Sequence, residues 1–279
     1  MKERPDAATI ARHTMPDANL SGRTVLAVFA HPDDESLACG GTLARLSDAG
    51  ARVVLLCASH GRRGAVSDPA LVPDGDLGRV RAEELRQAAR VLGVADADAV
   101  ILDHPDGDLR WADAPQFDKE ITSAIRDYRA DAVITFDDDG LYWHIDHVGI
   151  HERTWDVVEA LGADAPSLYF VTMPKGVIRQ VFDAAVKTGW TQPASGPWAI
   201  VPDAFGLDAK PPTVVVDVGD WVPRKVAAVL CHRTQMGADN PFMRLDPADA
   251  RRWLGTEQFR RLAPQTGCSL LEPLGNQNI

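Results

Sequence analysis

The sequence predicts a single α/β domain of three layers, in which a mostly parallel central sheet is covered by helices on both faces. Short apolar runs alternate with segments of helical periodicity from residue 24 to residue 172. Most of these runs are apolar at nearly every position, which is typical of strands buried on both faces. A chain of 279 residues is long enough to bury one large core of this kind.

Six apolar runs are the candidate strands, namely 24–30, 52–58, 99–103, 132–136, 167–172 and 213–218. Helical patterns lie between the first five of them, at 36–49, 79–92, 116–129 and 146–161. Gly50, Gly93 and Gly162 follow three of these patterns, at positions where a left-handed C-cap is expected. Parallel strands joined by helices bring their carboxyl ends to one edge of the sheet, so a functional site is expected at that edge.

The two ends of the chain are less regular. Residues 1–22 show no periodicity and are expected to form a mobile or loosely packed arm before a domain at 23–279. The portion 172–279 is more irregular: residues 189–212 hold five prolines and predict a long loop, and helices are expected at 222–236 and 247–262. Another long connection, 59–78, leaves the second candidate strand and is expected to border the site.

Composition excludes several classes of protein. The formal net charge of -11 and the absence of a basic stripe argue against a nucleic-acid partner. No apolar run is long enough for a membrane span, and the first residues carry charges and prolines where a signal peptide would be apolar, so a cytoplasmic protein is predicted. The four cysteines are far apart, which predicts ordinary buried thiols and not a disulfide scaffold or a thiolate metal site.

Two clusters of ionisable residues follow strand candidates. The hexapeptide 30–35 (AHPDDE) ends the first apolar run, and the tetrapeptide 144–147 (HIDH) comes soon after the run at 132–136. Both clusters are expected at the same carboxyl edge of the sheet, where their imidazoles and carboxylates would lie close together. We therefore hypothesise a single metal at this edge.

Zinc favours nitrogen and oxygen donors, and catalytic sites usually supply three protein ligands and leave one position to water. His31, Asp34 and His147 suit this pattern, and Asp33 would remain free to act as a base. Iron or another divalent ion stays open, since imidazole and carboxylate ligands do not select strictly. The alternative is structural: Asp33 or Asp34 caps the helix at 36–49, and His31 is a core histidine.

The two histidines of the second cluster are related as i and i+3 on a helix beginning there. Only one of them is then well placed as a ligand, which leaves the other for catalysis. Asp146 is expected to orient one of these two imidazoles, as carboxylates do for histidines near metals. A helix N-terminal acid facing solvent is the alternative for Asp146.

At these residues the chain resembles the LmbE-like, or PIG-L, family of zinc-dependent de-N-acetylases. The family is marked by the AHPDDE motif at a strand end and by a later HPDH-type motif. The resemblance extends from residue 23 to about residue 236 and includes LGRVRAEEL at 77–85, ITFD at 134–137 and the pattern Lys225-x-x-Ala228-x-x-x-His232-x-Thr234-Gln235. It implies a Rossmann-like fold and hydrolysis of an N-acetyl amide by metal-activated water.

The resemblance also implies roles for individual residues. The family's metal ligands match His31, Asp34 and His147. The acid that activates water matches Asp33, and the imidazole that stabilises the oxyanion or protonates the leaving amine matches His144, supported by Asp146. Contacts to sugar hydroxyls match Arg81 and Asp106, and a contact to the amide carbonyl matches Tyr142. A helix surface position for Arg81 and a turn position for Asp106 are equally compatible with the sequence.

The chain departs from the family pattern at two positions. Ile145 replaces the usual proline of the second motif, which loosens the turn without removing a ligand, and Arg62 stands where the family often has glutamate, which reverses a charge beside the pocket. If Arg62 or Arg63 faces the site, an anionic or phosphorylated group on the substrate is favoured; two solvated loop arginines are the alternative.

The implied partner is a small amide substrate, either an N-acetylglucosamine conjugate or a secondary metabolite of a bacterium. An amidase acting on a bulkier thiol conjugate or acylated metabolite is the alternative function, and a catalytically silent binding protein is a weaker one. A nucleotide-binding regulatory domain is disfavoured, since no G-x-G-x-x-G follows the first strand. Whether the chain forms a homo-oligomer stays open.

Overall fold

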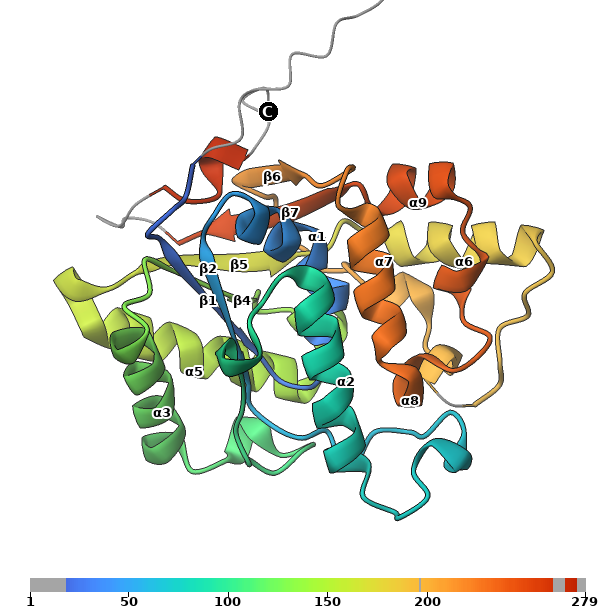
Figure 1. Ribbon diagram of the computed structural model, residues 1–279, viewed down its shortest axis with the longest axis horizontal. Coiled ribbons are helices and arrows are strands. Elements are labelled where there is room, and N and C mark those ends of the chain that lie inside the picture. Colours follow the sequence, from blue (N-terminus) through green and yellow to red (C-terminus); the bar gives the residue numbers. More distant parts are fainter. Residues whose placement is uncertain (1–18, 196, 263–268, 275–279) are drawn as a thin grey trace, which may run out of the picture.

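The computed structural model describes residues 19–195, 197–262 and 269–274. Within these ranges one seven-stranded sheet has the order β3-β2-β1-β4-β5-β7-β6 (Figure 1). The strands are β1 (Thr24–Phe29), β2 (Arg52–Cys57), β3 (Ala99–Ile101), β4 (Ala132–Phe136), β5 (Ser167–Thr172), β6 (Val214–Asp217) and β7 (Thr256–Arg261). Strands β1 to β5 are parallel, whereas β7 is antiparallel to both β5 and β6. The predicted single α/β domain with a mostly parallel sheet is confirmed.

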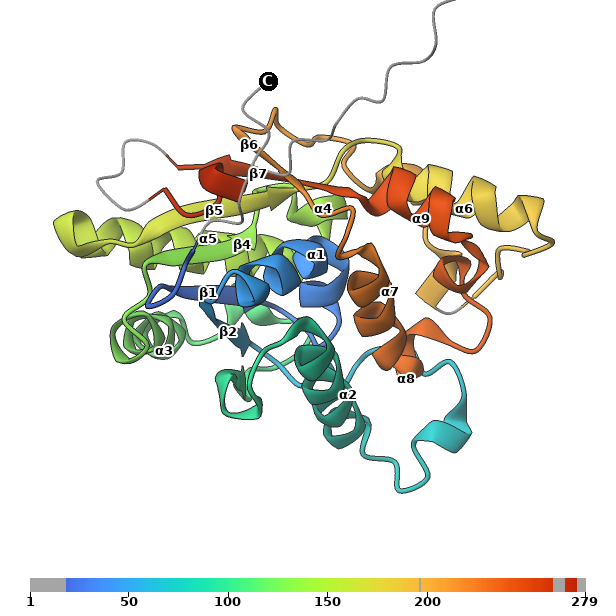
Figure 2. The same ribbon diagram turned by 45° about the horizontal axis from the view of Figure 1, so that its top comes forward.

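The helices of the described residues are α1 (Asp34–Asp48), α2 (Leu77–Leu92), α3 (Ala114–Asp127), α4 (Gly140–Trp143), α5 (Ile145–Leu161), α6 (Val177–Lys187), α7 (Val222–Cys231), α8 (Arg233–Met236) and α9 (Pro247–Leu254). Helix α1 connects β1 to β2, α2 connects β2 to β3, and α3 connects β3 to β4 on the other side of β1. Right-handed crossovers then place α3 on the face opposite α1 and α2. Figure 2 shows α1, α2 and α7 packed together, with α3 and α5 forming the other layer.

The site edge of the sheet is defined by β1 and β4. These strands are fully buried neighbours, and Val25 pairs with Ala132. The strand order reverses between them, since β2 and β3 lie to one side and β5 to the other. Such a topological switch point, at the carboxyl ends of the strands, is where α/β sheets open a crevice for a ligand. The first cluster directly follows β1, and the second follows β4 after the short helix α4.

Several elements differ from the sequence expectations. The helix predicted at 247–262 is wrong in its second half, because α9 ends at Leu254 and residues Thr256–Arg261 form β7. The helix predicted at 222–236 is divided into α7 and α8 around His232. Helix α6 was not predicted. The mobile arm predicted at 1–22 falls mostly on residues 1–18, which lie outside the described residues.

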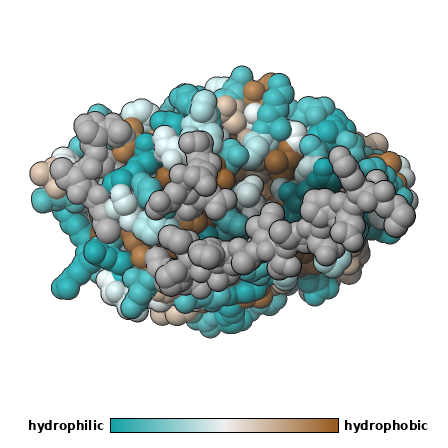
Figure 3. Space-filling view, turned by 90° about the horizontal axis from the view of Figure 1, so that it is seen from above, coloured by the Kyte–Doolittle hydropathy of each residue, from teal (hydrophilic) through white to brown (hydrophobic). Residues whose placement is uncertain are grey.

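Hydrophilic residues and scattered apolar ones are mixed on the coloured part of the face seen in Figure 3. No helix in the described part of the chain is long and apolar enough to cross a membrane.

Candidate active site

The ends of β1 and β4 bring the two predicted clusters together. The ring centroid of His31 lies 5.0 Å from that of His144 and 5.5 Å from that of His147, and the centroids of His144 and His147 are 4.5 Å apart. One ring nitrogen from each of these three histidines lies within 4.8 Å of the other two. Residues 113 or more positions apart in the chain therefore share one site.

His147 presents a nitrogen that has no hydrogen-bond partner. Its Nδ1 lies 3.1 Å from the carbonyl oxygen of Gly140, which can only accept a hydrogen bond, so Nδ1 carries the proton and donates it. The Nε2 atom is buried, makes no hydrogen bond, and lies 3.1 Å from Oδ1 of Asp34. The ring is fixed by stacking on Phe136 at a centroid distance of 4.0 Å.

His31 is held in a similar way by two carboxylates. Its Nε2 lies 2.9 Å from Oδ2 of Asp146 and 3.2 Å from Oδ1 of Asp106, while its Nδ1 faces Oδ2 of Asp34 at 3.4 Å. The carboxylate of Asp146 is itself fixed, because it accepts hydrogen bonds from the backbone N–H groups of Gly107 and Leu109 at 2.7 and 2.9 Å. Asp146 therefore orients His31, and not His144 or His147 as expected from the sequence.

The charges around His31 and Asp34 support each other. Burial alone would lower the pKa of His31, but hydrogen bonds to Asp106, Asp146 and Asp34 outweigh it and raise the pKa well above the usual value. Burial alone would raise the pKa of Asp34, but the neighbouring imidazoles of His147 and His31 hold that pKa well below its usual range. The carboxylate of Asp34 is thus ionised between the two imidazoles.

These contacts form a candidate metal site. A buried nitrogen without a hydrogen-bond partner, a second imidazole whose far nitrogen is held by carboxylates, and an ionised carboxylate between them are the donors that a divalent ion binds. Two sets of donor atoms in the described residues each lie within 4.8 Å of one another, one from His31, His144 and His147 and the other from His31, Asp106 and Asp146. Asp34, 3.1 Å from Nε2 of His147, borders the first set.

Asp33 lies at the edge of this cluster in an unusual backbone conformation, with φ 134° and ψ -25°. Its Oδ2 is 3.1 Å from Nη2 of Arg81. Burial raises the pKa of Asp33 to about 6, although Arg81 opposes this rise. Arg81 is 3% exposed and also donates to the carbonyl oxygens of Gly61 and Pro32. Its guanidinium therefore holds the Asp33 turn, and the contact to sugar hydroxyls that the resemblance implies stays a prediction.

Asp106 lies beside His31 at the same edge of the sheet. One oxygen contacts His31, and the other accepts a hydrogen bond of 2.5 Å from the backbone N–H of Arg63. Both oxygens therefore have partners inside the protein, which gives Asp106 a supporting position beside His31, and the contact to a sugar hydroxyl stays a prediction.

His144 and Tyr142 line the same cluster from the second strand end. Burial, together with His147 and His31, lowers the pKa of His144 to about 4, so the ring is neutral at neutral pH. Its Nδ1 accepts a hydrogen bond of 3.3 Å from the backbone N–H of Asp146, which leaves the proton on Nε2. The Tyr142 ring lies 5.7 Å from that of His144 and 5.4 Å from that of His147, and packs on Phe205.

The two loop arginines do not leave an uncompensated positive charge at the site. Arg62 pairs with Asp103 at 2.6 Å and Arg63 pairs with Asp108 at 2.9 Å, and all four side chains are about half exposed or more. The expectation of an anionic substrate group loses its main support, since each guanidinium already has a carboxylate partner.

Known proteins resemble this chain over most of its length. The family described as PIG-L, GlcNAc-PI de-N-acetylase, matches residues 26–158. The 1D-myo-inositol 2-acetamido-2-deoxy-alpha-D-glucopyranoside deacetylase of Thermobispora bispora is 31% identical over 277 residues, which cover 89% of this chain and 91% of the relative. The enzyme of the same name from Kineococcus radiotolerans is 33% identical over 267 residues, which cover 80% of this chain and 73% of the relative.

Solved structures share the fold. The N,N'-diacetylchitobiose deacetylase from Pyrococcus horikoshii superposes with a TM-score of 0.59 at 21% identity, covering 86% of this chain and 84% of that one. The protein TT1542 from Thermus thermophilus superposes with a TM-score of 0.56 at 22% identity, covering 88% of this chain and 96% of that one. The similarity to the family that the two motifs indicated is therefore confirmed in sequence, and the predicted architecture is confirmed in structure.

Proposed function

The chain belongs to the PIG-L family of de-N-acetylases, and we propose that it removes the N-acetyl group of an N-acetylglucosamine-type substrate by metal-dependent hydrolysis. The observation that supports this most directly is the free, buried Nε2 of His147 directed at Asp34 beside His31. Its deacetylase relatives cover nearly the whole chain, which favours an intact enzyme over a silent binding protein.

Three residues would hold the metal, which we propose to be zinc: His31 through Nδ1, Asp34 through its carboxylate, and His147 through Nε2. A bound zinc ion would supply Lewis-acid activation of water and of the amide carbonyl. Iron(II) is the main alternative, because the same ligands accept it. Asp106 and Asp146 would support His31 by holding its Nε2 proton.

The remaining residues would perform the acid–base chemistry. As water adds to the amide carbon, Asp33 accepts its proton; the C–N bond then breaks, and the same proton passes to the leaving nitrogen, giving acetate and a free amine. His144 is neutral with its proton on Nε2, so it would donate a hydrogen bond to the carbonyl oxygen as negative charge develops there. Tyr142, beside both histidines, would contact the same oxygen.

The relatives point to the class of substrate. Both are named for a substrate in which N-acetylglucosamine is joined to inositol, and we propose a glycoside of this class for the present chain. A bulkier acylated amide is the alternative, and a substrate panel separates the two.

The test is release of free amine by the full-length protein from 1D-myo-inositol 2-acetamido-2-deoxy-alpha-D-glucopyranoside, from simple N-acetylglucosaminides and from acylated natural products. Protein loaded with zinc is compared with protein treated with a chelator and with protein reloaded with iron(II). Release from the inositol glycoside that disappears with the chelator is expected. Release only from bulky amides would replace the proposed substrate class, and no release from any substrate with zinc bound would count against hydrolysis.

A further inference from the structure

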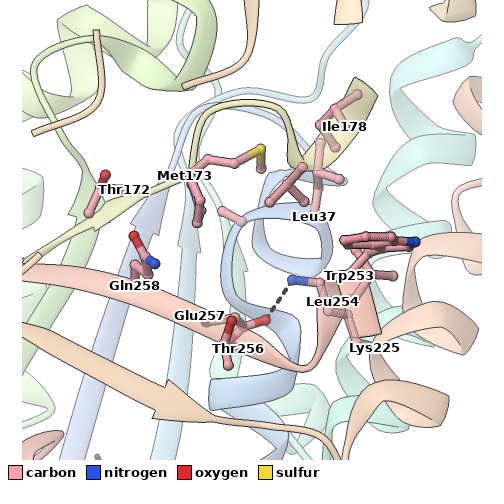
Figure 4. Close-up of a pocket in the computed structure, with 13 residues that line it drawn as sticks. Leu37, Thr172, Met173, Ile178, Lys225, Trp253, Leu254, Thr256, Glu257 and Gln258 are labelled. Atoms are coloured by element: carbon pink, nitrogen blue, oxygen red, sulfur yellow. Dashed lines mark hydrogen bonds and ion pairs between the residues drawn. The ribbon is translucent and has the colours of Figure 1, made fainter. Parts of the chain in front are cut away.

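The sequence pattern that extends from Lys225 to Gln235 has no part in the catalytic groups described above. In the structure, three of its polar side chains each meet a buried glutamate. These pairs are Lys225 Nζ with Glu257 at 2.6 Å, His232 Nε2 with Glu35 at 2.8 Å, and Thr234 Oγ1 with Glu84 at 2.6 Å. Figure 4 shows the first pair beside a small cavity, where Lys225 of α7 points toward Glu257 of β7.

The first and third pairs hold helices in place. The carboxylate of Glu257 also accepts hydrogen bonds from the backbone N–H groups of Gly41 and Thr42, just after Cys39, where α1 departs from helical geometry. Glu84 on α2 accepts hydrogen bonds from both the N–H and the hydroxyl of Thr234. Neither pair touches the residues of the catalytic cluster.

The second pair reaches the catalytic cluster directly. Oε1 of Glu35 accepts hydrogen bonds from Nε2 of His232 at 2.8 Å and from the hydroxyl of Ser36 at 2.5 Å. Oε2 of the same carboxylate accepts a hydrogen bond from the backbone N–H of Asp33 at 3.1 Å. His232 and Glu35 are 0% and 2% exposed, so water does not compete for this bridge.

The backbone of Asp33, which donates to Glu35, has an unfavourable conformation. Asp33 has a φ of 134°, a value that residues other than glycine rarely adopt. Such conformations persist where the surrounding structure holds them, and they cluster at functional sites. Arg81 holds the turn from one side, through the carbonyl oxygen of Pro32 and the carboxylate of Asp33. Glu35 holds it from the other side, through the Asp33 N–H.

We propose that His232, acting through Glu35, is a positioning residue that fixes the backbone of Asp33 so that its carboxylate faces the attacking water. The proposal rests on the role of Asp33 as the base in the proposed function. It assigns a catalytic purpose to a histidine that lies 74 residues beyond the segment matched by the family.

The test compares two substitutions of His232 in the full-length, metal-loaded protein. His232→Leu removes the donor to Glu35, and we expect kcat to fall about 10- to 100-fold, the scale of a misplaced catalytic group, with KM and bound metal unchanged. His232→Gln keeps an amide donor and is expected to recover kcat to within about 5-fold of the unsubstituted protein. Should the leucine variant fail to fold, Glu35→Asp replaces it, because the shorter carboxylate no longer reaches both partners.

Thr234→Val is the matched control. It removes a buried hydroxyl bonded to Glu84 in the same corner of the fold, so it should lower the free energy of unfolding while leaving kcat unchanged. Equal kcat in the His232→Leu or Glu35→Asp protein and in this control would overturn the proposal, as would a loss confined to KM or to metal content. An unsubstituted protein that releases no amine would instead overturn the proposed function, so the two failures are distinguishable.

Discussion

The proton on His31 is placed by residues that lie far from it in the sequence. Nε2 of His31 faces two carboxylates, and Asp146 is held rigidly by the N–H groups of Gly107 and Leu109. A carboxylate that accepts the far N–H of a metal-binding imidazole fixes its tautomer and makes the other nitrogen more basic. The ionisable residues around His31 thus lie on two sides of its ring, with Asp34 facing the proposed metal position and Asp146 on the opposite side.

Asp146→Asn tests this arrangement. The amide removes the negative charge behind His31, and we expect affinity for zinc to fall about 10- to 100-fold. Competition with a chromophoric chelator measures the affinity. Asp103→Asn, which changes an exposed carboxylate paired with Arg62, is the control and should leave affinity unchanged. Equal zinc affinities in the two variants would reject the supporting role of Asp146.

Asp33→Asn separates proton transfer from metal binding. The amide has nearly the same size but cannot take the proton of water, so kcat is expected to fall about 10²- to 10⁴-fold. Zinc stoichiometry should stay unchanged, because the three proposed ligands remain. Amine release and zinc content are measured on the same samples. A kcat close to that of the unsubstituted protein would reject Asp33 as the base.

At the scale of the elements, the strands of the central sheet could be predicted because burial on both faces makes their sequences continuously apolar. Strand β7 could not, since its buried positions include Glu257, and the purpose of that carboxylate becomes visible only against Gly41 and Thr42, more than 200 residues earlier. The pattern of apolar and polar residues cannot identify a partner that is so distant in the sequence.

The same limit applies to the site. The convergence of the two clusters was predictable, because each follows a strand and parallel strands share an edge. The partners of each side chain were not, because Asp146 meets His31 only where the loop at 106–109 packs against the start of α5. The three internal acceptors of Arg81 were not predictable either, because two of them are backbone carbonyls, which leave no signal in the sequence.

The end of α3 offers a test of local backbone strain away from the site. Arg129 is exposed and has a φ of 52° just after the C-cap residue Tyr128. A left-handed conformation costs a non-glycine residue roughly 1–2 kcal/mol, and glycine loses part of that gain through its greater freedom when unfolded. Arg129→Gly is therefore expected to raise the free energy of unfolding by about 0.5–1 kcal/mol.

Urea unfolding measures this change through the midpoint of the transition. Arg126→Gly, one turn earlier within α3, is the control and should lower stability by about 1 kcal/mol, because glycine is unfavourable inside a helix. If both substitutions lower the free energy of unfolding, backbone strain at Arg129 does not reduce the stability of the folded protein.

For the whole molecule, the buried ion pair of His232, between α7 and α8, with Glu35 of α1 makes the free energy of unfolding depend on pH. Burial alone would lower the pKa of His232, but the charge and hydrogen bond of Glu35 outweigh it and raise the pKa above the usual value. The folded protein then binds this proton more tightly than the unfolded chain does. The stabilisation is complete below the unfolded pKa and is lost as pH rises through the folded pKa.

The expected outcome concerns the difference in free energy of unfolding between the unsubstituted protein and His232→Gln, both freed of metal. That difference should be largest below the ordinary histidine pKa of about 6.5 and should decrease as the pH is raised through the higher pKa of the folded protein. Taking the difference removes the contribution of His31, whose pKa is also raised but which both proteins contain. Urea unfolding across this pH range provides the values. A difference that is constant with pH would mean that His232 is not charged in the fold and that Glu35 is held by a neutral imidazole; a difference that grows with pH would contradict the raised pKa itself.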